Sequence, residues 1–269
     1  MEKKNVVVIG GSRGLGFELA AEFVARGSNI VVTSRQLPNA EEAAAKLSGS
    51  APAQSKVFGL EADISSFESL DKLKADAVSK LGGIDIVVVN AGINQPATKV
   101  WDSAKVDIDT VLATDLRGPI YAAKVFLPAM ISRKSGAIWF IEGLGSNGMT
   151  VDKYALYGTS KRALAYFWRA LAKEAKGSKV KICALSPGMM ITDFLLQNLA
   201  LESEDQKKRT IRLYNILADK PETVARFAVP RILSNRRNGR IVTWLTRRKS
   251  LYRFLASAFS KRRVVDAGA

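Results

Sequence analysis

The chain has 269 residues, 47% of them hydrophobic, with one cysteine, Cys183, and no histidine. These counts exclude Ser–His–Asp and Cys–His nucleophile systems, imidazole-bound metals, internal disulfides and thiolate clusters, and they fit a reducing compartment. The net charge of +16 is uneven, because the segment from Lys207 to Arg263 holds 17 basic and 2 acidic residues. We therefore expect Tyr, Lys, Asp or Glu as acid or base, no metal, and either an anionic partner or a solvated basic face.

Seven short apolar segments alternate with helical patterns along the chain. Most of these segments are continuously apolar, which is typical of strands buried on both faces of a parallel sheet. The predicted strands are Asn5–Ile9, Ile30–Thr33, Lys56–Leu60, Asp85–Asn90, Ala137–Ile141, Val180–Leu185 and Arg240–Trp244, and helices are predicted at Gly14–Arg26, Ser66–Leu81, Gly118–Ser132 and Asp152–Ala175. The alternation predicts one α/β domain over residues 1–245, with a doubly wound parallel sheet and helices on both faces.

Residues 194–235 interrupt this alternation, because they are polar and helical and lie between the sixth and seventh predicted strands. An insertion there lies at the carboxyl end of the sheet, where ligands bind, so we predict a substrate lid. A surface helix pair without a function is the alternative. No apolar segment is long enough to cross a bilayer, and the first one is too short for a signal peptide, so a secreted protein is not expected.

The first predicted strand is followed by a turn that opens a helix, with the sequence Gly10-Gly11-Ser12-Arg13-Gly14-Leu15-Gly16. Glycines allow a tight turn and a close approach of the backbone to a pyrophosphate, and the helix start supplies free N–H groups. The end of the second strand carries Ser34 and Arg35, where NAD-binding folds usually place an acid. Arg35 and Arg13 suit a 2′-phosphate, so NADPH is predicted rather than NADH.

Tyr157 and Lys161 lie four residues apart at the start of the helix after the fifth strand. This spacing places both side chains on one helix face. A lysine ammonium close to a phenol favours the phenolate and is expected to lower the pKa of the tyrosine. The pair is therefore predicted to supply a proton donor.

Up to residue 245 the chain resembles the short-chain dehydrogenase/reductase family. The motifs that carry the resemblance are Gly10, Gly14 and Gly16, Asp63, Asn90-Ala91-Gly92, Tyr157 and Lys161, and Ser186-Pro187-Gly188 followed by Thr192. The resemblance implies a Rossmann-like sheet of seven parallel strands and a homodimer or homotetramer. It also implies that Asp63 contacts the adenine and that Asn90 to Gly92 shape the wall of the cofactor site. Lys161 would then bind the nicotinamide ribose, and Pro187 to Thr192 would bind the nicotinamide amide.

Two positions depart from the family pattern. Asp115 stands where many members carry an asparagine that holds a water in the proton relay; an aspartate could order that water too, but its charge would perturb Lys161. The catalytic serine usually lies thirteen residues before the tyrosine, where this chain has Leu144. We assign that role to Ser146, eleven residues before Tyr157, because a glycine-rich segment surrounds it.

The shorter serine spacing, the segment Tyr157-Gly-Thr-Ser-Lys161-Arg and the segment that begins at Leu185 are similar to the chlorophyll(ide) b reductase branch of the family. This branch reduces the C7-formyl group of chlorophyll b or chlorophyllide b to hydroxymethyl. The resemblance implies a hydrophobic substrate and a cytoplasmic or thylakoid-associated chloroplast location. Candidates for a wide apolar mouth, unless they only pack in the core or lid, are Met149, Met189, Met190, Phe194 and Leu195.

Two other functions stay open. The chain could reduce another hydrophobic ketone or aldehyde, such as a lipid, steroid or polyketide. It could also be a non-catalytic NADPH-binding adaptor that docks through its basic tail; the intact Tyr157/Lys161 pair argues against this reading, while Asp115 leaves it some room.

Residues 246–269 form a basic tail with one apolar helical stripe, made of Leu251, Phe254, Leu255, Ala258 and Phe259. Lysines and arginines flank the stripe on both sides between Arg247 and Arg263. This composition is typical of an interfacial helix on an anionic membrane, so residues 246–263 are predicted to make the protein a peripheral membrane protein. Packing of the stripe on the catalytic domain or on a second subunit is the alternative. Nucleic acid is not expected, because charge is the only signal for it.

Overall fold

A computed structural model describes residues 3–93, 97–191, 204–257 and 262–265. Its centre is a seven-stranded sheet in the order β3-β2-β1-β4-β5-β6-β7, in which every neighbouring pair of strands is parallel. The strands are β1 (Asn5–Ile9), β2 (Asn29–Ser34), β3 (Val57–Glu61), β4 (Ile86–Val89), β5 (Ala137–Ile141), β6 (Lys181–Ser186) and β7 (Ile241–Thr243). The predicted doubly wound fold is confirmed, and each strand end lies within one residue of its predicted position.

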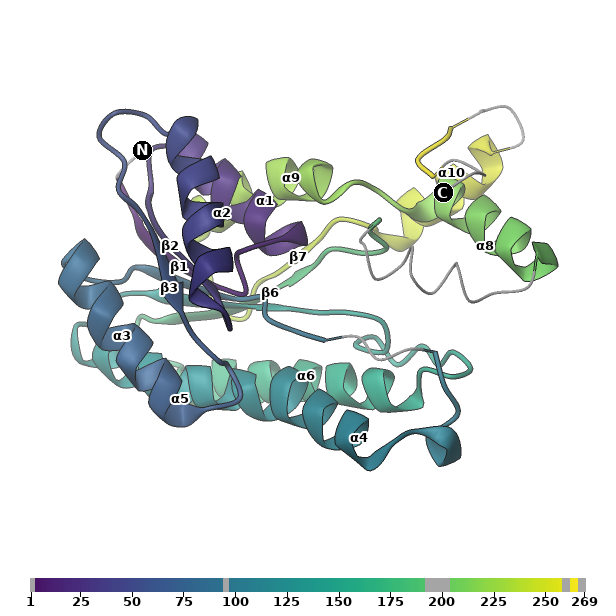
Figure 1. The fold of residues 1–269 in the computed structure, drawn as a ribbon, viewed down its shortest axis with the longest axis horizontal. Coiled ribbons are helices and arrows are strands. Elements are labelled where there is room, and N and C mark those ends of the chain that lie inside the picture. Colours follow the sequence, from purple (N-terminus) through teal and green to yellow (C-terminus); the bar gives the residue numbers. More distant parts are fainter. Residues whose placement is uncertain (1–2, 94–96, 192–203, 258–261, 266–269) are drawn as a thin grey trace.

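Helices cover both faces of the sheet (Figure 1). One face carries α1 (Gly14–Ala25), α2 (Leu37–Gly49) and α9 (Pro221–Leu233), and the other carries α3 (Phe67–Leu81), α4 (Lys105–Leu112), α5 (Gly118–Ser132) and α6 (Ala155–Glu174). The sequence did not single out α2 and α4. The sequence also predicted that α6 starts at Asp152. Lys153 adopts a φ of +65°, which is not helical, so the helix begins only at Ala155.

Alternate residues of each strand enter two separate apolar cores. In β1, Val6 and Val8 pack with residues of α1, α2 and α9, whereas Val7 and Ile9 pack with residues of α3, α5 and α6. All four side chains are almost fully buried. Burial on both faces explains why the strands read as continuous apolar segments. The two cores hold the carboxyl ends of the strands in a fixed order, and the candidate site is built there.

The segment 194–235 is not a single lid. Its second half is α9, which buries Val224, Ala228 and Val229 against the sheet and α1, so the lid interpretation is wrong for these residues. Its first half includes α8 (Glu204–Leu217), which lies beside α10 (Arg247–Ala256) beyond the end of the sheet (Figure 1). We call α8, α10 and residues 262–265 together the α8–α10 unit. No described helix has both the length and the apolarity that a membrane span requires.

Candidate active site

The glycine turn between β1 and α1 is packed too tightly for side chains. Gly10 adopts a φ of +78°, and a Cβ there would lie 2.6 Å from the Cα of Ala91. A Cβ on Gly16 would collide with the carbonyl oxygen of Gly10 and with the amide of Asn90. The Asn90 side chain donates to that same carbonyl oxygen at 2.7 Å, which ties the end of β4 to the turn. The predicted residues Gly10, Gly16, Asn90 and Ala91 therefore form one contiguous floor.

The start of α1 is open toward solvent. Arg13 occupies the N-cap position, but its side chain accepts no capping hydrogen bond, and no acidic residue lies in the first helical turn. Gly14 adopts a φ of +56°, and a Cβ on it would meet no atom within 4 Å. Leu15 is buried beneath the turn. Free N–H groups at a helix start and an open surface above Gly14 are what a pyrophosphate requires, so these residues fit a dinucleotide.

The residues predicted to read the rest of the nucleotide surround this turn. Arg13 and Arg35 are exposed, Ser12 and Ser34 are partly buried, and the Ser34 hydroxyl accepts from the N–H of Gln36 at 3.3 Å. The Asp63 carboxylate is held within its own loop, where it accepts from the N–H and the hydroxyl of Ser65 at 2.8 and 2.7 Å. Within the described part of the chain, neither arginine pairs with a carboxylate, so both remain free for a phosphate.

Lys161 is buried between the end of β4 and a single π-helical turn, η2 (Ala113–Arg117). Its Nζ lies 3.3 Å from Oδ2 of Asp115, and the other carboxylate oxygen, Oδ1, accepts from the N–H of Ile93 at 2.7 Å. A Cβ on Gly92 would lie 3.4 Å from both the Lys161 Nζ and the Asp115 Oδ1. Gly92 thus leaves space beside a buried ion pair, and Asp115 positions Lys161 directly.

The Tyr157 hydroxyl lies against Gly143, which was not among the predicted residues. A Cβ on Gly143 would lie 2.5 Å from the phenol oxygen and 3.3 Å from Cγ of Lys161. The Lys161 Nζ is 5.5 Å from the centre of the Tyr157 ring, so the two predicted residues do share one helix face. The space at Gly143 is visible only in the structure, although a glycine two residues after a buried strand was a signal for it.

The pKa values of these three groups shift together. Burial raises the pKa of the Tyr157 phenol, and Asp115 raises it further, so that the lowering effect of Lys161 is outweighed. The net lowering expected from the sequence is therefore wrong for this structure. Burial also raises the pKa of Asp115, although the nearby Lys161 lowers it. Burial lowers the pKa of Lys161, but Asp115 and Tyr157 together raise it by more, so the pKa of Lys161 lies above its usual value. At neutral pH Tyr157 keeps its proton, as a proton donor must.

Ser146 is buried, and its hydroxyl is engaged by backbone groups. It accepts from the N–H of Gly143 at 3.1 Å and donates to the carbonyl oxygen of Lys161 at 3.3 Å. In this arrangement Ser146 holds the loop after β5 against α6. Hydrogen-bond donation from Ser146 to a substrate stays a prediction, because it requires the hydroxyl to leave the Lys161 carbonyl.

Glu142 is a second residue that the sequence did not single out. This buried carboxylate accepts from Nε1 of Trp168 and from the guanidinium of Arg169, both at 3.0 Å. Its N–H donates to the carbonyl oxygen of Leu185 on β6. Glu142 therefore joins β5, β6 and α6 immediately before Gly143, and it fixes the position of the loop that touches Tyr157.

The loop after β6 contains the residues that are predicted to bind the nicotinamide. Pro187 is buried, and Gly188 adopts a φ of +75° where a Cβ would collide with Leu245. Met189 and Met190 are partly buried, and the backbone on both sides of Met190 pairs with Asp219. The predicted residues Thr192, Phe194 and Leu195 lie outside the described residues.

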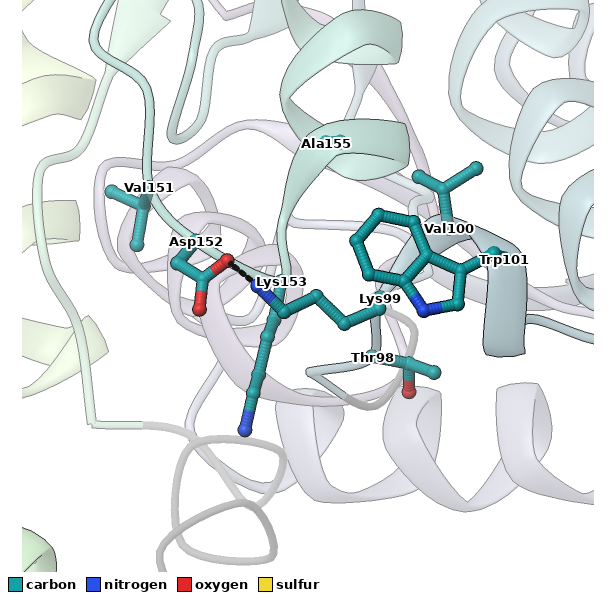
Figure 2. A pocket seen from close by; sticks show the side chains of 8 residues that line it. All are labelled: Thr98, Lys99, Val100, Trp101, Val151, Asp152, Lys153 and Ala155. Carbon is teal, nitrogen blue, oxygen red and sulfur yellow. Dashed lines mark hydrogen bonds and ion pairs between the residues drawn. The ribbon is translucent and has the colours of Figure 1, made fainter.

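A shallow pocket of about 200 Å³ lies between the loops after β4 and before α6 (Figure 2). In Figure 2, Lys99 reaches across it to Asp152, and the two side chains pair at 2.5 Å. The rim exposes large apolar side chains, with Trp101 80% exposed, and the pocket ends at Ala155, two residues before Tyr157. The other exposed apolar residues of these two loops are Val100, Met149 and Val151.

Sequence comparison finds plant relatives of this chain. The chain is 32% identical over 282 residues to a probable chloroplastic chlorophyll(ide) b reductase of Arabidopsis thaliana, covering 98% of this chain and 55% of that protein. It is 30% identical over 236 residues to a chloroplastic chlorophyll(ide) b reductase of Oryza sativa subsp. japonica, covering 85% of this chain and 66% of that protein. The chain thus spans between half and two thirds of the length of these relatives.

Solved structures share the fold. L-sorbose reductase from Gluconobacter frateurii, complexed with NADPH and L-sorbose, superposes with a TM-score of 0.78 at 23% identity, over 90% of this chain and 95% of that one. A metagenomic short-chain oxidoreductase in complex with NADP gives a TM-score of 0.72 at 21% identity, over 90% and 96% of the two chains. The family model described as short chain dehydrogenase matches residues 4–202. This chain therefore belongs to the short-chain dehydrogenase/reductase family of oxidoreductases.

Proposed function

We propose that the chain reduces the C7-formyl group of chlorophyll b or chlorophyllide b to hydroxymethyl, with NADPH as the reductant. The observation that carries the proposal is Tyr157 beside the buried Lys161–Asp115 pair, at the carboxyl ends of the strands. The substrate is suggested by the relatives from Arabidopsis thaliana and Oryza sativa, whose names include this activity.

The residues around the glycine turn favour NADPH. The open start of α1 suits the pyrophosphate, and Arg13 and Arg35, which pair with no described carboxylate, suit a 2′-phosphate through charge-assisted hydrogen bonds. When bound, NADPH supplies the hydride that the carbonyl carbon accepts. Lys161 lies at the floor of this region, where its ammonium can hold ribose hydroxyls.

Proton transfer belongs to Tyr157. Its phenol donates a proton to the carbonyl oxygen as that oxygen gains negative charge, and the resulting phenolate is stabilised by the nearby Lys161 ammonium. Asp115 keeps Lys161 protonated and in place, although its own charge opposes the phenolate. Ser146 holds the loop of Gly143 next to the phenol, and it donates to the same carbonyl oxygen only if its hydroxyl rotates.

A large apolar substrate suits the exposed rim beside the site. Trp101, Met149 and Val151 are at least 44% exposed, and they lie on the two loops that border the Figure 2 pocket or adjoin it. Contiguous exposed apolar side chains beside a catalytic group are a feature of ligand-binding surfaces. A flat macrocycle could cover this rim while its formyl group reaches Tyr157.

The activity is tested with purified protein, NADPH and chlorophyllide b, following the loss of the formyl absorbance. Tyr157→Phe is expected to lower the rate by about a thousandfold, since the proton donor is removed, while NADPH binding persists. Tyr166→Phe is the matched control, because Tyr166 lies on the same helix and is 78% exposed.

Other outcomes decide between the two alternatives. Reduction of only smaller or unrelated aldehydes and ketones would favour a different hydrophobic carbonyl substrate. Binding of NADPH without reduction of any carbonyl would favour a non-catalytic adaptor. A homodimer or homotetramer remains a prediction from the family, and light scattering on the same sample measures it.

We further propose that α10 places the protein on an anionic membrane surface. Its outward face carries the exposed Leu251, Phe254 and Leu255 together with the exposed Arg247 and Arg248. These apolar side chains point away from the domain, which argues against the alternative that they pack on it. Apolar and cationic side chains on one helix face complement the headgroup and acyl regions of an anionic bilayer.

The membrane proposal is tested by sedimentation with phosphatidylglycerol vesicles. The double variant Leu251→Glu and Leu255→Glu is expected to abolish co-sedimentation, because both residues are more than 60% exposed and their change leaves the fold intact. Val106→Glu on α4, which is 66% exposed, serves as the control. Unchanged sedimentation of the double variant would reject the proposal.

A further inference from the structure

The facing sides of α8 and α10 border a second cavity, which is open to solvent and separate from the candidate active site. Its volume is about 730 Å³, within the range of small-molecule sites of roughly 300–1,000 Å³. From α8 it is lined by residues at positions i, i+3, i+4, i+7 and i+8 of one helix face, which begins at Lys208 and ends at Ile216. This cavity lies on the side of α10 opposite to the exposed apolar stripe.

The lining of this cavity is strongly cationic. Among the lining residues that the structure describes, five are lysines or arginines and none has a carboxylate. Two of them have structural partners: Arg253 and Arg262 both pair with Asp219 at 2.6 Å and donate to carbonyl oxygens at the end of α8. The other three, Lys208, Arg212 and Arg263, have no acidic partner within the described part of the chain. Their charge is available to a ligand.

The positive charges in this unit also oppose one another. Burial, together with the neighbouring Arg253 and Arg262, lowers the pKa of Lys249 to about 8 in spite of Asp219. The same effects lower the pKa of Arg262. In the described part of this unit Asp219 pairs with both Arg253 and Arg262, so one carboxylate serves two cations, and an anion that entered the cavity would relieve the repulsion between them.

The remaining described lining combines apolar side chains with the polar Asn215 and Ser257. Ile211 and Ile216 of α8 face Ala256 and the ring of Tyr252 of α10 across the cavity. Inorganic anions need no such surface, whereas a molecule with an anionic group and a hydrocarbon body satisfies both kinds of lining. A phosphate monoester carries a charge of about −1.5 to −2 and pairs well with several cations.

We propose that this cavity binds one molecule of a phosphate monoester with an apolar body, with the phosphate on Lys208, Arg212 and Arg263. The apolar body lies between Ile211, Ile216 and Tyr252. This site is independent of the carbonyl reduction proposed above, and its occupant is a single amphipathic anion and not a bilayer.

The test is calorimetric titration of the full chain with dihexanoyl phosphatidic acid below its micelle concentration, in the presence of saturating NADP⁺ so that the nucleotide site is blocked. Inorganic phosphate supplies the charge alone, and dihexanoylglycerol supplies the apolar body alone. The phosphatidic acid is expected to bind at least about tenfold more tightly than either, because only it satisfies both halves of the lining.

The variant Lys208→Glu with Arg212→Glu is expected to weaken binding by about tenfold or more. Arg209→Glu is the matched control on the same helix, since Arg209 is exposed and does not line the cavity. Equal binding of inorganic phosphate would overturn the apolar part of the site. An equal loss in Arg209→Glu, or no loss in the double variant, would overturn the site itself.

Discussion

The half of the sheet that carries the glycine turn and the α8–α10 unit are held in place by different forces. α1 buries six residues, including Leu19 and Phe23, whereas α10 buries none. The α8–α10 unit depends instead on Asp219, which accepts from Arg253, Arg262 and Nε1 of Trp244. Attachment through charge-assisted bonds leaves the apolar side chains of α10 free for other contacts, and it concentrates the stability of the unit in one carboxylate.

The two arginines also complete the α8 helix. Arg253 donates to the carbonyl oxygen of Leu217, and Arg262 donates to those of Asn215 and Ile216. These carbonyl groups have no intrahelical partners at a helix end, and cations there are favoured by the helix dipole. A tail that is read from the sequence as a separate extension is therefore part of the structure of α8.

The largest expected effect tests this difference directly. Asp219→Asn leaves the partly buried guanidinium groups of Arg253 and Arg262 without a counter-charge, so the local free energy of opening of the α8–α10 unit is expected to fall by about 3 kcal/mol. Hydrogen exchange should accelerate in α8 and α10, while the amides of β1 and β4 stay protected.

Val229→Ala is the control for the apolar half of the comparison, because Val229 is fully buried in α9. It is expected to destabilise the sheet and its helices together by about 2 kcal/mol. If Asp219→Asn destabilised the whole domain equally, the view of two separately held regions would be wrong.

A second prediction concerns packing at the candidate site, where the Tyr157 phenol lies directly against Gly143. Gly143→Ala places a methyl group 2.5 Å from the Tyr157 hydroxyl, so kcat is expected to fall by about a hundredfold through displacement of the phenol. Steady-state kinetics measure the effect, and thermal unfolding verifies the fold.

Gly158→Ala is the matched control for this substitution. A Cβ on Gly158 meets nothing closer than the Cα of Gly145 at 4.0 Å, and the helix gains about 0.5–1 kcal/mol from alanine. Full activity in Gly143→Ala would show that the phenol does not need the position that the structure gives it.

The smallest effect is a change in pH dependence. The Asp115 carboxylate raises the pKa of Tyr157, and both groups titrate above their usual ranges. In Asp115→Asn the phenol should therefore lose its proton at lower pH, so the alkaline decline of carbonyl reduction is expected to move to lower pH. Profiles of kcat/KM against pH measure the shift, with Asp109→Asn, an exposed pair with Lys105, as the control. A shift in the opposite direction would contradict the role of Asp115.

Much of the candidate site could be predicted because its signals are local. Gly10, Gly14 and Gly16 are required by backbone geometry within one turn, and Tyr157 and Lys161 share a face through helix periodicity alone. Gly143 and Glu142 were missed because their importance arises from contacts with residues more than a dozen positions away. The orientation of the Ser146 hydroxyl toward the Lys161 carbonyl has the same origin.

The sequence by itself determined the strand positions, the parallel doubly wound sheet and the nucleotide turn, because apolar periodicity and glycine sterics act over a few residues. Only the tertiary structure decided that α9 belongs to the core and that α8 and α10 form one basic unit on Asp219. It also decided that Tyr157 keeps a raised pKa. Each of these depends on which distant groups share a buried, low-dielectric space, and burial and charge pairing are properties of the folded chain as a whole.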